Sequence, residues 1–164
     1  MKNNILAKLK EIKLFLFDLE GVLIHNGNVN NQESVKTFLG DIKDFVEELS
    51  SYGLKSGIVT ARKEDELILE LKKLEGIYII ASTFEKVQAV EKLLAELGID
   101  FKAVFYTGDE VLDIPLLSKC GISAAPAWAS RDVKRSVNFI FKGISAHTIL
   151  PEISALIKSV HINK

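Results

Sequence analysis

The sequence predicts an α/β fold built on a mainly parallel sheet, and three features of the chain support this prediction. Short apolar runs alternate with longer segments whose apolar residues recur at helical spacing. Glycines follow several of these helical segments, where they commonly end a helix. Polar residues follow several of the apolar runs directly. Regular alternation of strand and helix is typical of parallel strands joined by right-handed helical crossovers.

The composition fits one globular domain over residues 1–164. Hydrophobic residues make up 48% of the chain and charged residues 26%, with a net charge of −1. No basic patch suggests nucleic-acid binding, and no apolar run approaches the roughly 20 residues of a membrane span. The single Cys120 excludes an internal disulfide and a cysteine-only zinc site. Residues 1–11 are expected to form a short helix or arm without signal-peptide features, so we expect a cytoplasmic protein.

Five strands and a weaker sixth are expected. The first, Ile12–Phe17, is an apolar run that stops abruptly at Asp18. The others are expected at Leu54–Val59, Ile77–Ala81, Ala103–Tyr106, Ile122–Ala125 and, weakly, near Val137–Phe141. The segment Ile24–Gln32 is rich in Asn and Gly, which predicts a turn or short hairpin.

Helices are expected where apolar residues recur every three or four positions. Glu33–Ser50 shows this spacing and is ended by Gly53. The other expected helices are Glu64–Leu74, Phe84–Leu97, Leu112–Lys119, Arg131–Ser136 and His147–Ile157.

The residues suited to chemistry lie at the predicted strand ends and at the start of one helix. These are Asp18 and Glu20 after the first strand, Thr60 and Arg62 after the second, Asp109, Glu110 and Asp113 after the fourth, and Lys86 at the start of the helix that follows the third. Because parallel strands end at one edge of a sheet, we expect these groups to meet there. A carboxylate cluster requires a counter-charge. A hard divalent cation, Mg²⁺ where phosphate is handled, would provide it.

These stretches resemble, in order, the four motifs of the haloacid dehalogenase superfamily. Asp18-Leu19-Glu20-Gly21-Val22-Leu23 is similar to the first motif, DxDG(V/T)L, and Ile58-Val59-Thr60-Ala61-Arg62 to the second. Lys86 stands where the lysine of the third motif belongs, and residues 106–115 are similar to the fourth, GDDxxDxP. The resemblance runs over about residues 12–126. It implies a Rossmann-like three-layer domain.

The spacing of the motifs leaves no room for a separate cap domain. A turn and one helix fill the interval from Asp18 to Thr60, and one helix and one strand fill that from Thr60 to Lys86. The chain thus resembles the capless branch that contains the 3-deoxy-manno-octulosonate 8-phosphate phosphatases. Residues 89–113, which include the helix end Lys-Leu-Leu-Ala-Glu-Leu-Gly-Ile, and residues 121–126 are also similar to that branch. The resemblance implies a homotetramer in which a neighbouring chain covers the site.

The resemblance also implies roles for the site residues. Asp18 would be the nucleophile that forms an aspartyl-phosphate, and Glu20 would stand where the general acid/base belongs. The implied phosphate-binding residues are Thr60, Ala61, Arg62 and Lys86. The implied Mg²⁺ ligands are Asp18, the backbone carbonyl of Glu20, and Asp109, with Asp113 and Glu110 in support. The implied activity is a Mg²⁺-dependent phosphatase acting on a small phosphorylated metabolite, for example a sugar-acid phosphate such as 3-deoxy-octulosonate 8-phosphate.

The chain departs from the family pattern in places that concern activity. Glu20 replaces the usual Asp, and its added methylene moves the carboxylate by roughly 1–1.5 Å, a misplacement that can cost on the order of a hundredfold. We therefore expect intact Mg²⁺ binding with weakened or altered chemistry. The segment after the first motif looks shorter than in the sugar-phosphate enzymes, and the tail has one glycine, Gly143, where they are Gly-rich. A sugar-acid carboxylate therefore has no obvious partner.

Other interpretations remain open at this point. A catalytically weakened relative could act as an oligomeric or regulatory module. A receiver-type phosphoacceptor domain also uses strand-end carboxylates, Thr and Lys, but it needs an acid after the third strand, where this chain has none. Without a shared site, Thr60 would cap a helix and Lys86 would be a solvated helix residue. Asp109 would then be a turn residue after Gly108, and Asp113 a surface charge. His25, His147 and His161 show no ligand spacing.

Overall fold

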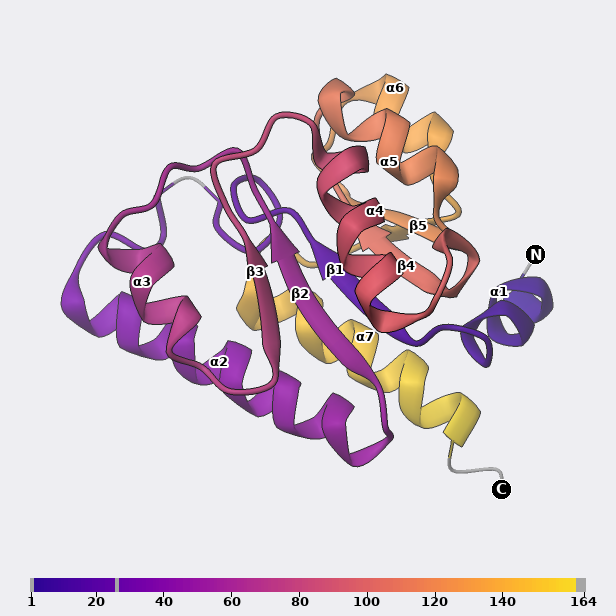
Figure 1. The fold of residues 1–164 in the computed structure, drawn as a ribbon, viewed down its shortest axis with the longest axis horizontal. Helices are drawn as coiled ribbons and strands as arrows, with labels where there is room; N and C mark the ends of the chain where they lie inside the picture. Colours follow the sequence, from indigo (N-terminus) through magenta and orange to yellow (C-terminus); the bar gives the residue numbers. More distant parts are fainter. Residues whose placement is uncertain (1, 26, 162–164) are drawn as a thin grey trace.

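A six-stranded parallel sheet forms the centre of the computed structural model, which describes residues 2–25 and 27–161 (Figure 1). The strands are β1 (Leu14–Phe17), β2 (Lys55–Val59), β3 (Ile77–Ile80), β4 (Val104–Thr107), β5 (Ile122–Pro126) and β6 (Phe139–Phe141). Their order is β3-β2-β1-β4-β5-β6, and every neighbouring pair is parallel. The predicted mainly parallel sheet is confirmed, including the weak sixth strand.

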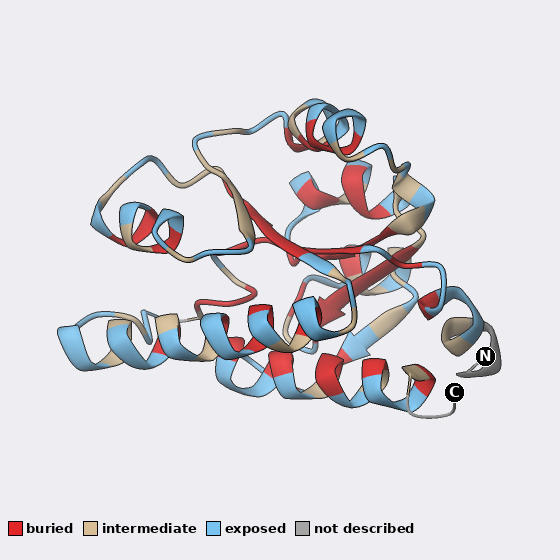
Figure 2. Ribbon diagram, turned by 60° about the horizontal axis from the view of Figure 1, so that its bottom comes forward, coloured by how far each residue is buried: buried red, intermediate tan, exposed pale blue. Residues whose placement is uncertain are grey.

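Helices cover both faces of the sheet, which gives three layers. The face that carries Phe15 and Phe17 packs against α2 (Gln32–Ser51), α3 (Glu66–Lys72) and α7 (Ala146–His161). The face that carries Leu14 and Leu16 packs against α4 (Lys86–Leu97), α5 (Ile114–Lys119) and α6 (Arg131–Ser136). Figure 2 shows the buried sheet as a layer between the helices. Apolar residues therefore fill both faces of β1, as expected for a central parallel strand.

Smaller elements complete the described chain. α1 (Lys2–Leu9) realises the predicted N-terminal helix and lies against α7 and β5. Two 3₁₀ turns, η1 (Phe101–Ala103) and η2 (Val111–Asp113), flank β4. The predicted helix over Leu112–Lys119 is therefore divided into η2 and α5, because Pro115 suits only the first turn of an α-helix. No described helix is long and apolar enough to cross a bilayer.

The described part of the loop after β1 does not contain the short hairpin, one of the two structures expected for Ile24–Gln32. The described part of Ile24–Gln32 forms turns and no hairpin; Asn26 lies outside the described residues. An isolated parallel bridge joins Glu20 to Ile24, and Gly21 donates to the Ile24 carbonyl at 2.7 Å. In the part of the chain that the structure describes, one α-helix lies between β1 and β2 and one between β2 and β3. The prediction of no cap domain is therefore confirmed.

The position of β1 determines where a ligand can bind. From β1 the chain proceeds to β2 and β3 on one side, then returns to β4 on the other side. A reversal of strand order opens a crevice at the carboxyl ends of the two strands involved. Asp18 follows β1 and Gly108-Asp109 follows β4, so both motifs lie at this crevice.

The packing of Gly121 against a backbone carbonyl makes a testable prediction about this fold. A Cβ at Gly121 would lie 1.9 Å from the Lys102 carbonyl oxygen, whereas a Cβ at Gly40 in α2 meets nothing within 4 Å. Gly121→Ala should reduce the free energy of unfolding by about 2–3 kcal/mol, measured by urea denaturation. Gly40→Ala is the matched control and should raise it by about 0.5–1 kcal/mol. Equal stability of both variants would contradict the packing at Gly121.

Candidate active site

Asp18 is a buried carboxylate at the first residue beyond β1. Its backbone N–H donates to the Thr107 carbonyl at 2.9 Å, which continues the β1–β4 ladder by one residue. Its Oδ1 accepts from the Leu19 backbone N–H at 2.7 Å, and its Oδ2 lies 2.8 Å from Lys86 Nζ. The strand and the lysine together fix the direction of this carboxylate.

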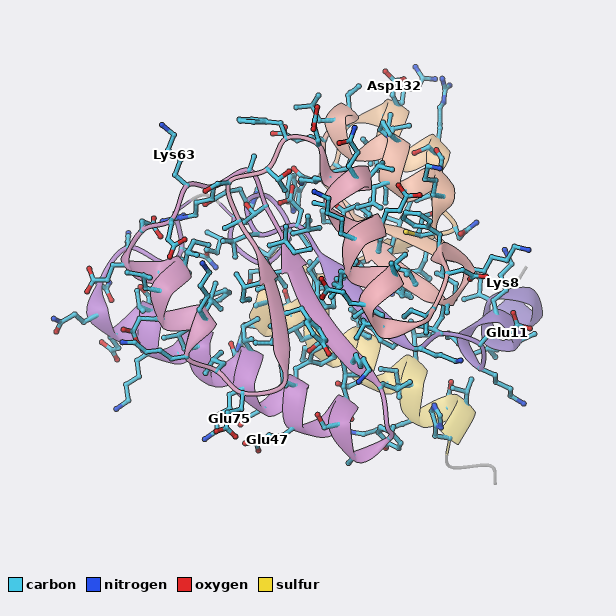
Figure 3. All side chains as sticks on the ribbon, viewed as in Figure 1. Lys8, Glu11, Glu47, Lys63, Glu75 and Asp132 are labelled. Carbon is cyan, nitrogen blue, oxygen red and sulfur yellow. The ribbon has the colours of Figure 1, made fainter. Side chains whose placement is uncertain are left out.

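Lys86 is buried at the start of α4 and lies between two carboxylates. Its Nζ is 2.8 Å from Asp18 Oδ2 and 2.8 Å from Asp113 Oδ1. Burial lowers the pKa of Lys86, but the charges of Asp18 and Asp113 outweigh burial and raise its pKa above the ordinary value. The lysine therefore stays charged, and the interpretation as a solvated surface lysine is wrong. The charged side chains labelled in Figure 3, such as Lys63 and Asp132, point outward instead.

Asp113 is fully buried, and both of its oxygens are saturated with hydrogen bonds. Oδ2 accepts from the backbone N–H groups of Asp109 at 3.0 Å and Glu110 at 3.1 Å. Oδ1 accepts from the Tyr106 hydroxyl at 2.6 Å and from Lys86 Nζ at 2.8 Å. A carboxylate has about four acceptor positions. Asp113 therefore uses all of them to hold the loop after β4 and the lysine.

Asp109 is also buried, but its Oδ1 has no hydrogen-bond partner among the described residues. Burial, followed by the charges of Asp18 and Asp113, raises the pKa of Asp109 to about 7. Burial likewise raises the pKa of Asp18 to about 7, although Lys86 opposes the shift. Two adjacent carboxylates with raised pKa values and one unpartnered oxygen are the environment that a divalent cation relieves.

The carboxylates fit a hard cation such as Mg²⁺. Oxygens of Asp18, Asp109 and Asp113 lie within 4.8 Å of one another, in the one metal-compatible cluster found among the described residues. Because Asp113 is saturated, Asp18 and Asp109 are the two carboxylates of this cluster that could hold a cation. A Cβ at Gly21 would lie 2.2 Å from Asp109 Oδ2, so the turn at Glu20-Gly21 packs directly on this carboxylate. Because this contact is made by the backbone, it does not depend on whether residue 20 is a glutamate or the aspartate of the family motif.

Thr60 ends β2 and faces the same crevice. It is buried, its backbone N–H donates to the Ile80 carbonyl at 2.8 Å, and its Oγ1 accepts from the Arg62 backbone N–H at 3.1 Å. The N-cap of α3 is Asp65, whose Oδ1 accepts from the Ile68 N–H at 3.0 Å. The interpretation of Thr60 as a helix cap is therefore wrong.

Glu20 lies apart from the carboxylate cluster. Its side chain is about half exposed and its carboxylate contacts the Arg62 guanidinium. Arg62 also binds Asp65, with Nε 2.8 Å and Nη2 2.6 Å from Oδ2. The predicted residues Glu20 and Arg62 thus come together, but as a pair at the edge of the site.

A small pocket of about 220 Å³ opens onto these groups. Its lining combines predicted site residues with two exposed apolar side chains that were not predicted: Asp18, Glu20, Thr60, Ala61, Arg62, Lys86, Glu110, Asp113, Phe84 and Leu112. All predicted phosphate-binding positions therefore line one pocket. Asp109 is not among the lining residues, but its backbone N–H donates to Asp113, which lines the pocket.

Sequence reasoning missed two residues that hold this site. Tyr106 is completely buried in β4 and donates to Asp113; burial, then Asp113 and Asp18, raises its pKa well above the ordinary value, so it remains a neutral donor. The available sequence signal for Tyr106 was its position in a strand directly before Thr107-Gly108-Asp109, which places a polar hydroxyl near the fourth motif. Asp65 stands three residues after Arg62 at a helix start, which is the usual spacing for a local ion pair.

The histidines and Trp128 lie outside the carboxylate cluster. His25 stacks on Trp128 with ring centroids 4.2 Å apart. His147 Nδ1 is 3.0 Å from Asp41 Oδ2, and the ring of His161 lies 5.0 Å from that of Tyr52. Each histidine thus contacts an aromatic ring or a carboxylate away from Asp18, Asp109 and Asp113.

Comparison with known proteins supports the same family as the motifs. Two curated relatives are named 3-deoxy-D-manno-octulosonate 8-phosphate phosphatase KdsC. The Salmonella typhi protein is 28% identical over 77% of this chain and 69% of its own length. The Escherichia coli K12 protein is 29% identical over 76% of this chain and 67% of its own length.

Solved structures share the fold. The phosphatase of the same name from Moraxella catarrhalis, in complex with magnesium, phosphate and KDO, has a TM-score of 0.84 at 24% identity and covers 99% of this chain and 95% of its own. The cobalt-bound Haemophilus influenzae phosphatase has a TM-score of 0.79 at 22% identity, covering 93% and 91%.

The family itself follows from a match along most of the chain. The model of the haloacid dehalogenase-like hydrolases matches residues 3–126, which include β1 to β5 and all four predicted motifs. This match favours a haloacid dehalogenase fold over the receiver alternative. The chain belongs to the haloacid dehalogenase-like hydrolase family.

Proposed function

We propose that the protein is a Mg²⁺-dependent phosphatase that cleaves a small phosphorylated metabolite through an aspartyl-phosphate on Asp18. The observation that carries this proposal is the buried Asp18 carboxylate, which contacts Lys86 and lies in one cluster with the unpartnered Asp109. The Asp18 nucleophile, the Lys86 ammonium and a position for a divalent metal ion thus lie together where a phosphoryl group can enter.

The reaction follows from the positions of these groups. An Asp18 oxygen attacks phosphorus, the bond to the leaving oxygen breaks, and Glu20 gives that oxygen a proton. Water then attacks the aspartyl-phosphate, Glu20 takes the proton of the water, and the bond from phosphorus to Asp18 breaks. An alcohol and inorganic phosphate leave.

The residues around Asp18 stabilise the negative charge of the transferring group. Lys86 provides a buried positive charge, and Thr60 offers a hydroxyl at the end of the neighbouring strand β2. Stabilising spread charge is most of what a phosphoryl-transfer site requires. Mg²⁺ bound to Asp18, Asp109 and the Glu20 carbonyl adds further positive charge at the phosphoryl oxygens.

The substrate that we propose is a sugar-acid phosphate, such as 3-deoxy-octulosonate 8-phosphate. The two curated relatives carry this activity in their names and match about three quarters of this chain. Their activity also favours an enzyme over a regulatory module that has lost its chemistry. The reduction in turnover expected from Glu20 stays a prediction, as do the single-domain extent and the cytoplasmic location.

We also propose a homotetramer, because the mouth of the pocket is apolar and open. Phe84, Leu112 and Val111 are exposed by 77%, 67% and 59%, and the first two line the pocket. A second chain over this rim would exclude water from the phosphoryl group. Closed symmetric assemblies are the usual form of such contacts.

The phosphatase proposal makes a direct prediction for Asp18→Asn. Wild-type protein with Mg²⁺ should hydrolyse 4-nitrophenyl phosphate and 3-deoxy-octulosonate 8-phosphate, with a higher kcat/KM for the sugar-acid ester. Asp18→Asn removes the nucleophile at nearly constant volume and should lower kcat by on the order of 10³-fold or more. Inactive wild-type protein whose Tm still rises with Mg²⁺ would support the regulatory alternative instead.

The raised pKa values predict how Mg²⁺ binding depends on pH. The pKa values of Asp18 and Asp109 are about 7 in the folded protein, against 3.8 for an unperturbed carboxyl. The metal-free folded state therefore holds more protons than the unfolded state between these values, and its stability falls as pH rises through that range. The Tm difference between Mg²⁺ and EDTA should accordingly be larger at about pH 8 than at about pH 5.5.

Asp109→Asn is the control for this measurement. It removes one proposed metal carboxylate and should leave a smaller Tm difference at both pH values, with only the pH dependence that Asp18 supplies. A wild-type difference that is equal at both pH values would contradict a cation on these two carboxylates.

The assembly is tested by light scattering after size-exclusion chromatography. We expect four times the mass of one chain, and Phe84→Ser should shift the protein towards smaller species because it removes an apolar contact from the rim. A wild-type monomer at assay concentration would overturn the tetramer.

A further inference from the structure

The Glu20 carboxylate is one end of a chain of three charged side chains. Arg62 Nη1 contacts Glu20 Oε1, while Arg62 Nε and Nη2 lie 2.8 Å and 2.6 Å from Asp65 Oδ2. Two edges of the Arg62 guanidinium thus bind two different carboxylates. A planar guanidinium held in this way fixes direction better than an ammonium does, because its donors form a rigid fork.

Asp65 is itself fixed by the start of α3. Its Oδ1 accepts from the Ile68 N–H at 3.0 Å, and α3 is anchored by the buried side chains of Leu67, Ile68 and Leu71. The second oxygen of Asp65 therefore presents a fixed acceptor to Arg62. The direction of the guanidinium depends on a helix that packs into the core.

The backbone of Arg62 is tied to the active site at two points. Its N–H donates to Thr60 Oγ1 at 3.1 Å, and its carbonyl accepts from the Ser82 N–H at 2.9 Å, in the loop between β3 and α4. Arg62 thus has a fixed backbone beside Thr60 and a fixed guanidinium beside Asp65. Its Nη1, on the other edge of the guanidinium, contacts Glu20.

A glutamate at position 20 needs this restraint. It has one more rotatable bond than aspartate, and its side chain is 52% exposed. A half-exposed side chain with that freedom loses entropy when it is held in one rotamer. A bond to a fixed guanidinium reduces that cost at the moment of reaction.

We propose that Arg62, anchored by Asp65, is a positioning residue that holds the Glu20 carboxyl for proton transfer to the leaving oxygen. The inference rests on the proposed function, and it assigns Arg62 a task other than binding the substrate phosphate. In the step concerned, the phosphorus–oxygen bond to the leaving group breaks as the Asp18–phosphorus bond forms. The proton held on Glu20 Oε2, the oxygen that Arg62 does not contact, passes to the leaving oxygen.

The identity of the leaving group separates these two tasks. An alcohol leaves poorly without a proton, whereas 4-nitrophenolate leaves as the anion. The value of kcat/KM reports the steps up to formation of the aspartyl-phosphate, so hydrolysis of the common intermediate does not enter it. We therefore compare kcat/KM for glycerol 2-phosphate with that for 4-nitrophenyl phosphate.

The variant Asp65→Asn tests the anchor without removing the helix cap. Asparagine is as good an N-cap as aspartate, but it takes away the charge that orients Arg62. We expect kcat/KM for glycerol 2-phosphate to fall by about tenfold or more, and that for 4-nitrophenyl phosphate to fall much less. Arg62→Lys, which keeps the charge but loses the fork, should show the same selective loss.

A double-mutant cycle shows whether Asp65 acts through Glu20. Glu20→Gln alone should cost about 10²-fold or more on glycerol 2-phosphate. Asp65→Asn added to Glu20→Gln should cost little more, since the group to be positioned is already absent. Additive losses would overturn the proposal.

Glu64→Gln is the matched control, because it removes a different ion pair of the same helix, that between Glu64 just before α3 and Lys72 in its last turn. It should leave both substrates within about twofold of wild type. An equal loss on both substrates in Arg62→Lys would overturn the proposal and assign Arg62 to the phosphate. Failure of the proposed function is distinguishable, because wild-type protein would then hydrolyse neither ester.

Discussion

The ammonium of Lys86 between two buried carboxylates is the interaction on which the rest of the site depends. Asp18 and Asp113 each lie 2.8 Å from Nζ, and all three side chains are nearly inaccessible to water. Removal of one partner from such a buried group typically costs about 3–5 kcal/mol. Asp109 adds a third buried acid, so one ammonium faces three carboxylates and leaves two negative charges uncompensated when all three are ionised. Burial is the main cause of the raised pKa values of Asp18 and Asp109, and the neighbouring negative charges add to it. The excess negative charge explains the requirement for a cation.

The fold provides this arrangement through the order of its strands. β1 is paired with β2 on one side and β4 on the other, so the residues that follow all three strands are neighbours in space. Both faces of β1 are filled with apolar side chains, which places the start of the acidic turn rigidly at residue 18. Asp113 then joins the loop after β4 to α4 by accepting from backbone and lysine together. Site and core are therefore parts of one packed structure.

Much of this site could be predicted from sequence because its residues lie at fixed places relative to strands. Asp18, Thr60 and Asp109 follow strand ends, and strand ends are found from apolar periodicity. Tyr106 could not be found in this way, because its position inside β4 marks it as a core residue. The division of the predicted helix after Glu110 depends on local turn geometry, and so does the absence of a hairpin from the described part of the loop after β1. Neither is encoded in periodicity.

The ion pair of Glu20 shows why the effect of one methylene could not be predicted from the motif alone. Comparison of Glu20 with the aspartate of the motif shows only that the carboxylate is moved by one methylene. It does not show what the moved carboxylate contacts. In the structure that carboxylate meets Arg62, which is itself held by Asp65 from a different element. A longer side chain that is anchored at its tip can present its carboxyl as reproducibly as a shorter one without an anchor, because both have few accessible rotamers. The consequence of the substitution is thus a property of three side chains, two of them outside the first motif.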